Sequence, residues 1–250
     1  MLKSVRQESV LALLHARGSA SITEIAATLG VSPATARRDI MALEQAGALT
    51  RTWGGAQVLT DVDDPFQEAV GRNGGAKQRI GAAAAALVKD GDTVILDIGT
   101  TVLYTAMALA SRQVTVVTAS LPVFEHLRGR PNISLTLLGG RWSEPYQCFD
   151  GPLVIDALAH QQADLAFLGC SGLSERGRVR DTSYSQAAIK RAVLQAASSS
   201  YLLCDADKLP GHGDSSPFDL SPLDGLITDA TLSAPLARLC EACSTPVIPA

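Results

Sequence analysis

The fold of the N-terminal part is decided by the stretch Val31-Ser32-Pro33-Ala34-Thr35-Ala36-Arg37-Arg38-Asp39-Ile40. Ser32 is a favourable N-cap, and Pro33 follows at the first helical position, where its missing N–H costs nothing. Ala36 and Ile40 recur at helical spacing, which predicts a buried stripe. The stretch therefore predicts an amphipathic helix whose other face carries two adjacent arginines.

Two further helices and a hairpin surround this arginine helix. Apolar residues at helical spacing predict a helix over residues 3–15. Ser21 and Glu24 form a capping-box pair, which predicts that the second helix begins there. After the arginine helix, short strands are expected at 49–53 and 56–59, on either side of a glycine pair.

Residues 1–59 are therefore predicted to form an α+β winged helix-turn-helix domain that binds DNA. Arginine can pair with a guanine edge or hold a phosphate, and hydroxyls near a helix N-terminus suit phosphate contacts. The candidate DNA-binding residues are Ser32, Ala34, Thr35, Arg37, Arg38, Met41 and Arg51. Two adjacent arginines alone are more often a solvated helix face, and a protein-binding module is a further alternative. The capped helices, the arginine pair and the hairpin together favour DNA.

The rest of the chain alternates short apolar strands with helical segments, after a linker expected at 60–75. Strands are predicted at 93–97, 114–118, 133–138, 164–168, 201–205 and 225–228. Helices are predicted at 76–89, 101–110, 121–128, 152–161, 185–198 and 234–243. This alternation predicts, over 76–250, a larger α/β domain with a mostly parallel sheet covered on both faces.

Composition narrows the classes of protein to consider. Hydrophobic residues make up 46% and charged residues 18% of the 250 residues, a globular balance. We expect a cytoplasmic protein with no membrane partner, since no apolar run is long enough to span a bilayer and no signal peptide is evident. The five cysteines are odd in number and lack metal-ligand spacing, so we expect reduced thiols and no metal.

Charge is divided unevenly along the chain. Residues 1–59 carry 6 Lys/Arg and 4 Asp/Glu, whereas residues 60–250 carry 15 and 21, within a net charge of −4. The first range, called the head below, is slightly basic and the remainder is acidic. This difference indicates two modules with different partners.

An anion site is predicted where Asp97-Ile98-Gly99-Thr100-Thr101 follows a strand and begins a helix. Backbone N–H groups, two hydroxyls and the positive end of the helix dipole would meet there. The turn lacks the spacing of a dinucleotide fingerprint and the lysine of a P-loop, so neither nucleotide motif is supported. Taken alone the motif is weak, because threonine at a helix start is often only a cap.

Both parts of the chain resemble one known family. In the head the resemblance rests on residues 31–40, on Leu43 and Gly47, and on Arg51-Thr52-Trp53-Gly54-Gly55-Ala56. In the remainder it rests on the anion turn and on Thr118-Ala119-Ser120-Leu121, Leu138-Gly139-Gly140, Gly151-Pro152, Ala187-Ala188-Ile189-Lys190, Asp205-Ala206-Asp207-Lys208 and Thr228-Asp229. These segments resemble the DeoR family of bacterial transcriptional regulators. Its sensor domain is similar to ribose-5-phosphate isomerase and binds phosphorylated sugars or related metabolites.

The resemblance implies a set of effector-binding residues. They are Asp97, Gly99, Thr100, Thr101, Ser120, Lys190, Asp205 and Lys208, with Lys77, Asp164, Ser171 and His212 as further candidates. Threonines would hold the phosphate, lysines would supply positive charge, and carboxylates would accept from sugar hydroxyls. No cofactor, no metal and no catalytic residue is expected.

The resulting hypothesis is a repressor of sugar or related carbon catabolism genes that binds a double-stranded operator and is controlled by a phosphorylated sugar. A weakly basic head favours a homo-oligomer, either a dimer or a tetramer. The alternative is a sugar-phosphate isomerase-like enzyme with a regulatory DNA-binding head. Gln186 stands where the family commonly has Glu, and an amide cannot act as the base that isomerisation needs.

Overall fold

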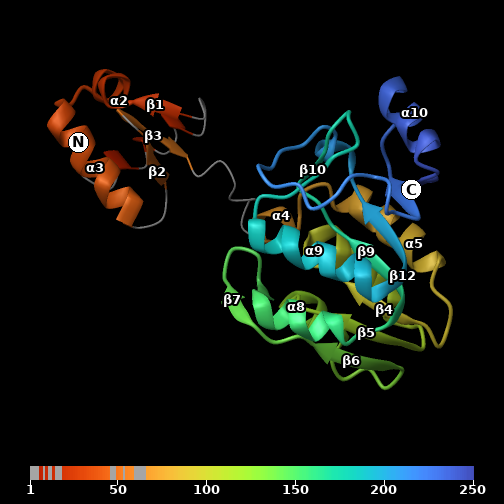
Figure 1. The fold of residues 1–250 in the computed structure, drawn as a ribbon. Helices are drawn as coiled ribbons and strands as arrows, with labels where there is room; N and C mark the ends of the chain where they lie inside the picture. The colour runs from red at the N-terminus through yellow and green to blue at the C-terminus, as the bar shows by residue number, and fades with distance from the viewer. Residues whose placement is uncertain are drawn as a thin grey trace. The chain divides into compact units, whose positions relative to one another are not determined.

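The computed structural model describes residues 6–7, 9–10, 13–14, 19–45, 49–52, 54–58 and 66–250 (Figure 1). The chain divides into two compact units, residues 1–62 and 63–250. Within the described residues no helix is both long and apolar enough to cross a membrane.

The first unit contains two well-defined helices and a small antiparallel sheet. Helix α2 spans Ile22–Leu29 and helix α3 spans Pro33–Gln45. Strands β1 (Ser19–Ser21), β2 (Leu49–Thr52) and β3 (Gly55–Val58) pair in the order β1-β3-β2. The helix predicted at 3–15 lies largely outside the described residues, and those of its residues that are described are helical.

Local sequence explains the turn between α2 and α3. The Ser21 side chain accepts from the Glu24 backbone N–H, and the Glu24 carboxylate accepts from the Ser21 backbone N–H, so the predicted capping box is confirmed. Gly30 ends α2 at φ 63°, a left-handed conformation that glycine adopts without a Cβ penalty. Ile25, Ala36 and Ile40 are buried and join the two helices in one core.

The hairpin differs in detail from its prediction. Gly55 is the first residue of β3 and not part of the turn, because it pairs with both Thr52 and Ser21. A Cβ on Gly55 would lie 2.3 Å from the Ala20 carbonyl oxygen, so the close approach of β1 requires glycine. The sequence pattern missed β1, which is only three residues long. Trp53 lies outside the described residues.

The second unit is an α/β domain with a parallel sheet, as predicted, but the sheet has a seventh strand at Val247–Pro249 that the sequence pattern missed. Its strands follow the order β14-β13-β12-β9-β4-β5-β6. They are β4 (Thr93–Leu96), β5 (Val114–Thr118), β6 (Ile133–Leu137), β9 (Ala163–Leu168), β12 (Ala197–Leu203), β13 (Gly225–Thr228) and β14 (Val247–Pro249). The connecting helices are α5 (Gly74–Ala86), α6 (Thr100–Leu109), α7 (Leu121–Leu127), α8 (Pro152–Ala159), α9 (Tyr184–Ala196) and α10 (Ala234–Ala242).

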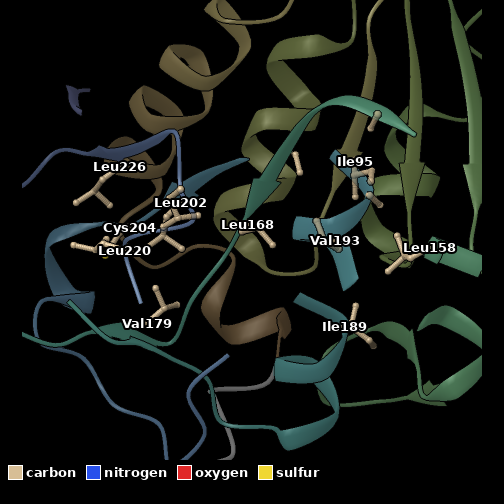
Figure 2. Packing of buried hydrophobic residues seen from close by; sticks show 14 of the residues in the cluster. Ile95, Leu158, Leu168, Val179, Ile189, Val193, Leu202, Cys204, Leu220 and Leu226 are labelled. Atoms are coloured by element: carbon tan, nitrogen blue, oxygen red, sulfur yellow. The ribbon is translucent and has the colours of Figure 1, made fainter. Parts of the chain in front are cut away.

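Each face of this sheet has its own hydrophobic core. Ile95 of β4 packs with residues of α8, α9 and α10 on one face, and Figure 2 shows Ile95 with Leu158 of α8 and Val193 of α9. Its neighbours Val94 and Leu96 pack with residues of α5, α6 and α7 on the other face. Side chains alternate along a strand, so apolar residues at every position bury both faces.

Several short elements were not predicted. Residues 66–75, assigned to the linker, instead form helix α4 (Phe66–Ala69) and the first residues of α5, and Phe66 packs in the second unit's core. Two hairpins also emerge, β7 (Arg141–Ser143) with β8 (Cys148–Asp150), and β10 (Gly172–Leu173) with β11 (Val179–Arg180). Such elements are too short to carry a detectable hydrophobic period.

The crossing of α5 and α6 depends on Gly81, because a Cβ there would lie 2.7 Å from the Tyr104 carbonyl oxygen. We expect Gly81→Ala to lower the free energy of unfolding of the second unit by about 1–3 kcal/mol, since backbone would have to move. Gly75→Ala, on the same helix, is the control: its Cβ would meet only the end of the Arg79 side chain at 3.9 Å. Equal melting temperatures for the two variants would contradict the role of Gly81.

Candidate functional site

Helix α3 presents a basic face to solvent. Ala34, Arg37, Arg38 and Met41 are exposed, while Ala36 and Ile40 on the opposite side are buried. The Ser32 hydroxyl accepts from the Thr35 backbone N–H at 3.2 Å and caps the helix. The predicted contact residues of α3 therefore lie along its first nine residues, on the side away from the core.

Asp39 of α3, which the sequence analysis did not single out, connects this helix to the N-terminal helical segment. Asp39 is 2% exposed, and its carboxylate accepts two hydrogen bonds from the Arg6 guanidinium, at 2.5 and 3.1 Å. The hydrogen bond with Asp39 raises the pKa of Arg6. This two-point contact joins the N-terminal helical segment to α3, directly beside Arg38.

Arg51 of β2 has a different setting from the other candidate DNA-binding residues. Its guanidinium lies 2.7 Å from the Glu44 carboxylate of α3, and about half of its side chain is exposed. A DNA phosphate at Arg51 would have to compete with Glu44.

In the second unit a cavity of about 300 Å³ lies at the carboxyl ends of β4, β9 and β12. It is lined by Phe66, Ala69, Arg72, Asn73, Lys77, Ile98, Gly99, Thr100, Thr101, Pro145, Tyr146, Gly169, Cys170, Ser171, Asp181, Lys190, Asp205, Asp207, Lys208 and His212. Open α/β sheets bind ligands at this edge, and the volume suits a small metabolite. We call this the effector cavity.

One side of the effector cavity is suited to an anion. Gly99 is the N-cap of α6 and has no side chain to satisfy the first-turn N–H groups, so an acceptor has to come from elsewhere. Thr100 and Thr101 follow it, with Lys77 and Lys208 on the same cavity. Burial lowers the pKa of Lys77, and the nearby Lys208 and Arg72 add to the lowering, although Asp205 opposes it. Anion binding would relieve this repulsion between cations.

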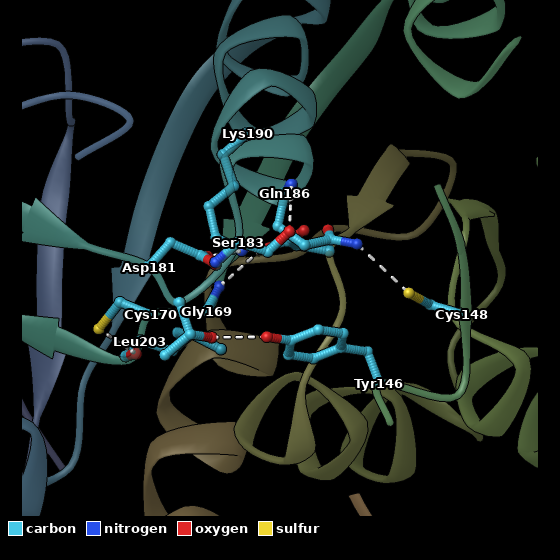
Figure 3. A network of polar contacts seen from close by, with 11 residues as sticks. Tyr146, Cys148, Gly169, Cys170, Asp181, Ser183, Gln186, Lys190 and Leu203 are labelled. Carbon is cyan, nitrogen blue, oxygen red and sulfur yellow. Dashed lines mark hydrogen bonds and ion pairs between the residues drawn. The ribbon is translucent and has the colours of Figure 1, made fainter. Parts of the chain in front are cut away.

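A buried ion cluster also borders the effector cavity. Lys190 of α9 places its ammonium 2.5 Å from Asp97, at the end of β4, and 3.3 Å from Asp181. Burial disfavours the charged amine, but the two carboxylates outweigh it and raise the pKa of Lys190. Figure 3 shows Lys190 and Asp181 meeting beside Gly169, whose N–H donates to Asp97 at 3.1 Å.

The structure brings most of the predicted effector-binding residues together. Gly99, Thr100, Thr101, Lys190, Asp205 and Lys208 all line the cavity. Asp97 and Asp164 do not line it: Asp97 pairs with Lys190, and Asp164 accepts from the Thr93 backbone N–H at 2.8 Å. Ser120 lies outside it, fully buried, and its hydroxyl caps α7 by accepting from the Val123 N–H.

Other cavity residues were missed. Asp181 stands in an irregular segment, and Arg72 and Asn73 fall in the range assigned to a linker. Their only signal was polarity near a helix start, which many surface turns share.

Gln186 gives no support to acid–base chemistry. It is fully buried, it does not line the cavity, and its amide donates to the Cys148 thiol at 3.4 Å. Burial, with Asp150 and Asp97 nearby, raises the pKa of Cys148 to about 12, so that thiol stays protonated. Within the described residues no group of three His, Cys, Asp or Glu side chains could hold a metal ion.

Two family models match the chain and together span most of it. The DeoR-like helix-turn-helix domain matches residues 6–62, and the DeoR C-terminal sensor domain matches residues 72–230. This chain belongs to the DeoR family. It is a transcriptional regulator that binds DNA through its helix-turn-helix and an effector through its sensor domain.

Characterised DeoR-family relatives are similar over nearly the whole chain. The transcriptional repressor GlcR of Bacillus subtilis is 34% identical, covering 92% of this chain and 89% of its own. The lactose phosphotransferase system repressor of Lactococcus lactis is 34% identical, covering 93% of each chain. The L-fucose operon activator of Haemophilus influenzae is 30% identical, covering 94% of this chain and 96% of its own. These relatives are regulators of transcription and not enzymes.

Among solved structures, ribose 5-phosphate isomerase from Plasmodium falciparum matches with a TM-score of 0.40 and 17% identity. The match covers 55% of this chain and 54% of that one.

Removing the buried cation from the ion cluster should destabilise the sensor unit strongly. We expect Lys190→Met to lower the free energy of unfolding by about 3–5 kcal/mol at pH 7, because Asp97 and Asp181 would remain buried without a counter-charge. Both carboxylates would then have raised pKa values, so the loss should shrink as the pH falls and they take up protons. Urea unfolding at several pH values measures this, with exposed Lys89→Met as the control. A loss that is the same at pH 4 and pH 7 would contradict the assignment.

Proposed function

We propose that the protein is a repressor of genes for sugar or related carbon catabolism, controlled by a phosphorylated sugar in the effector cavity. The observation that carries this is the composition of the cavity lining: the first-turn N–H groups of α6 with the cations Lys77 and Lys208, and carboxylates such as those of Asp181 and Asp205. A phosphate suits the former, and hydroxyls that donate hydrogen bonds suit the latter.

The names of the relatives support sugar metabolism as the field of regulation. Two relatives at 34% identity are repressors, one of a lactose phosphotransferase system, and one at 30% is an activator of an L-fucose operon. We therefore propose repression with release by effector, acting in the cytoplasm where the operator is. A hundredfold loss of operator affinity on effector binding needs about 2.7 kcal/mol of coupling between the two sites.

DNA binding is proposed to use the exposed face of α3. Ser32, Ala34, Thr35, Arg37, Arg38 and Met41 supply base and phosphate contacts, and Arg51 supplies one from the wing. One head of net charge +2 holds few phosphates, so we propose that a homodimer or homotetramer reads repeated half-sites.

The effector class can be tested by ligand-induced stabilisation. A sugar phosphate at a hundred times its dissociation constant should stabilise the folded protein by about 2.7 kcal/mol, roughly 5–10 °C in the melting temperature of a unit of this size. The same sugar without its phosphate should give little shift. Thr100→Val should abolish the shift, whereas Thr136→Val, an exposed change of the same kind on the edge strand β6, should preserve it. A panel in which no phosphate ester shifts the melting temperature would overturn the phosphate assignment.

The DNA surface can be tested by the salt dependence of operator binding. Replacing both Arg37 and Arg38 by Ala should weaken binding and reduce the slope of log affinity against log salt by about 1–2, since each lost phosphate contact removes about one counterion. A double variant with the same loss of charge, Lys89→Ala with Arg128→Ala, lies on exposed positions of the sensor unit and should leave the slope unchanged. Equal slopes for both double variants would count against α3 as the DNA-reading helix.

A further inference from the structure

Two cysteines stand side by side at the base of the effector cavity. β9 and β12 are neighbouring parallel strands, with Leu168 paired to Leu202. Cys170 and Cys204 each follow two residues later, so the same register places them opposite one another. Adjacent positions of this kind fall within the Cα separation that a disulfide needs.

Local contacts agree with this register. The Cys170 sulfur lies 3.9 Å from the carbonyl oxygen of Leu203, the residue before Cys204, and the Cys204 thiol donates to the carbonyl oxygen of Asp205 at 3.7 Å. Figure 3 shows the Cys170 sulfur beside Leu203. Both cysteines are free thiols.

Only one cysteine of the pair can be reached from the effector cavity. Cys170 is half-buried and lines the effector cavity, whereas Cys204 is completely buried and does not line it. The neighbouring Cys170 thiol and burial together raise the pKa of Cys204. A reagent that enters the cavity therefore meets Cys170 first, with Cys204 directly behind it.

The other three cysteines have different settings. Cys148 is buried and accepts a hydrogen bond from Gln186, away from the cavity. Cys240 and Cys243 lie at the C-terminal end of α10. They provide controls on the same chain.

We propose that Cys170 and Cys204 form a reversible disulfide when the protein meets a hydroperoxide, and that this disulfide weakens effector binding. The claim that the disulfide weakens effector binding rests on the proposed function, whereas the claim that the disulfide forms does not. Cysteine pairs in reducing compartments that do form disulfides are usually redox-sensing or catalytic.

The chemistry is a two-electron oxidation. The Cys170 sulfur attacks the hydroperoxide, the O–O bond breaks, and an alcohol leaves while Cys170 becomes a sulfenic acid. The Cys204 sulfur then attacks the Cys170 sulfur, and the S–O bond breaks. The hydroxyl leaves as water with the Cys204 proton, so two thiols and one hydroperoxide give one disulfide, one alcohol and one water.

The bond would act on residues that bind the effector. Ser171 follows Cys170 and Asp205 follows Cys204, and both line the cavity. Bringing the two sulfur atoms to bond length draws these two turns together. By linkage, an occupant that binds the reduced form better must itself oppose disulfide formation.

The site is tested on the full-length protein with cumene hydroperoxide. Peptide mapping should find a link between Cys170 and Cys204, reversed by a thiol reductant. Cys204→Ser should instead trap the sulfenic acid, seen as a dimedone adduct on Cys170. The double variant Cys240→Ser with Cys243→Ser should still form the link. A protein that stays fully reduced, or that links other cysteines only, would overturn the site.

The regulatory half is tested with ribose 5-phosphate and inorganic phosphate as probes. Their protection of Cys170 from iodoacetamide reports occupancy of the cavity in the reduced protein, and their thermal shifts report binding in both redox states. We expect at least a tenfold weaker affinity after oxidation, and no such loss in Cys204→Ser. Equal affinity in the two states would overturn the regulation while leaving the disulfide. A disulfide that forms in a protein that no phosphate compound protects or stabilises would instead overturn the proposed effector class.

Discussion

The architecture of the sensor unit depends on one buried charge arrangement, the ammonium of Lys190 between the carboxylates of Asp97 and Asp181. These residues come from α9, from the end of β4 and from the position after β11, so the cluster joins three parts of the chain that are far apart in sequence. Charges taken out of water require close partners. The Gly169 N–H is part of the same arrangement, because it donates to Asp97. Lys190 and Asp181 also line the effector cavity, so electrostatic interactions hold that part of its wall.

In the sensor unit the strands form the hydrophobic cores, and the turns at their carboxyl ends form the effector cavity. The strand residues Val94, Ile95 and Leu96 are committed to the two cores, and none of them lines the effector cavity. The cavity is formed where strands end and helices begin, by turns such as 98–101 and 205–208. Relatives named for lactose and for L-fucose share about a third of their residues with this chain. Such divergence is compatible with one sheet because the turns can change without repacking it.

The sequence predicted the long elements well because their signals are local. A capping box at Ser21, a proline at the start of α3 and runs of apolar residues each report a physical requirement of one segment. The helix start at Thr100-Thr101 was predicted for the same reason, because the strand-to-helix turn has a local sequence signal. Asp181 and the Arg6–Asp39 contact were not found, because each depends on partners far along the chain. Ser120 was assigned to the effector site, yet its hydroxyl serves a helix cap, a role that sequence alone does not separate from ligand binding.

Helix α4 has a consequence for the reach of the DNA-binding head. Phe66 and Ala69 line the effector cavity, and the Ala69 carbonyl accepts from the Lys77 ammonium at 2.7 Å. α4 is also the first described element after β3, with residues 59–65 between them. An extended chain of that length spans at most about 25 Å. Unwinding the four residues of α4 would lengthen this connecting segment by about 8 Å, because a helix rises far less per residue than an extended chain. The residues through which the chain enters the sensor unit thus form a wall of the cavity itself.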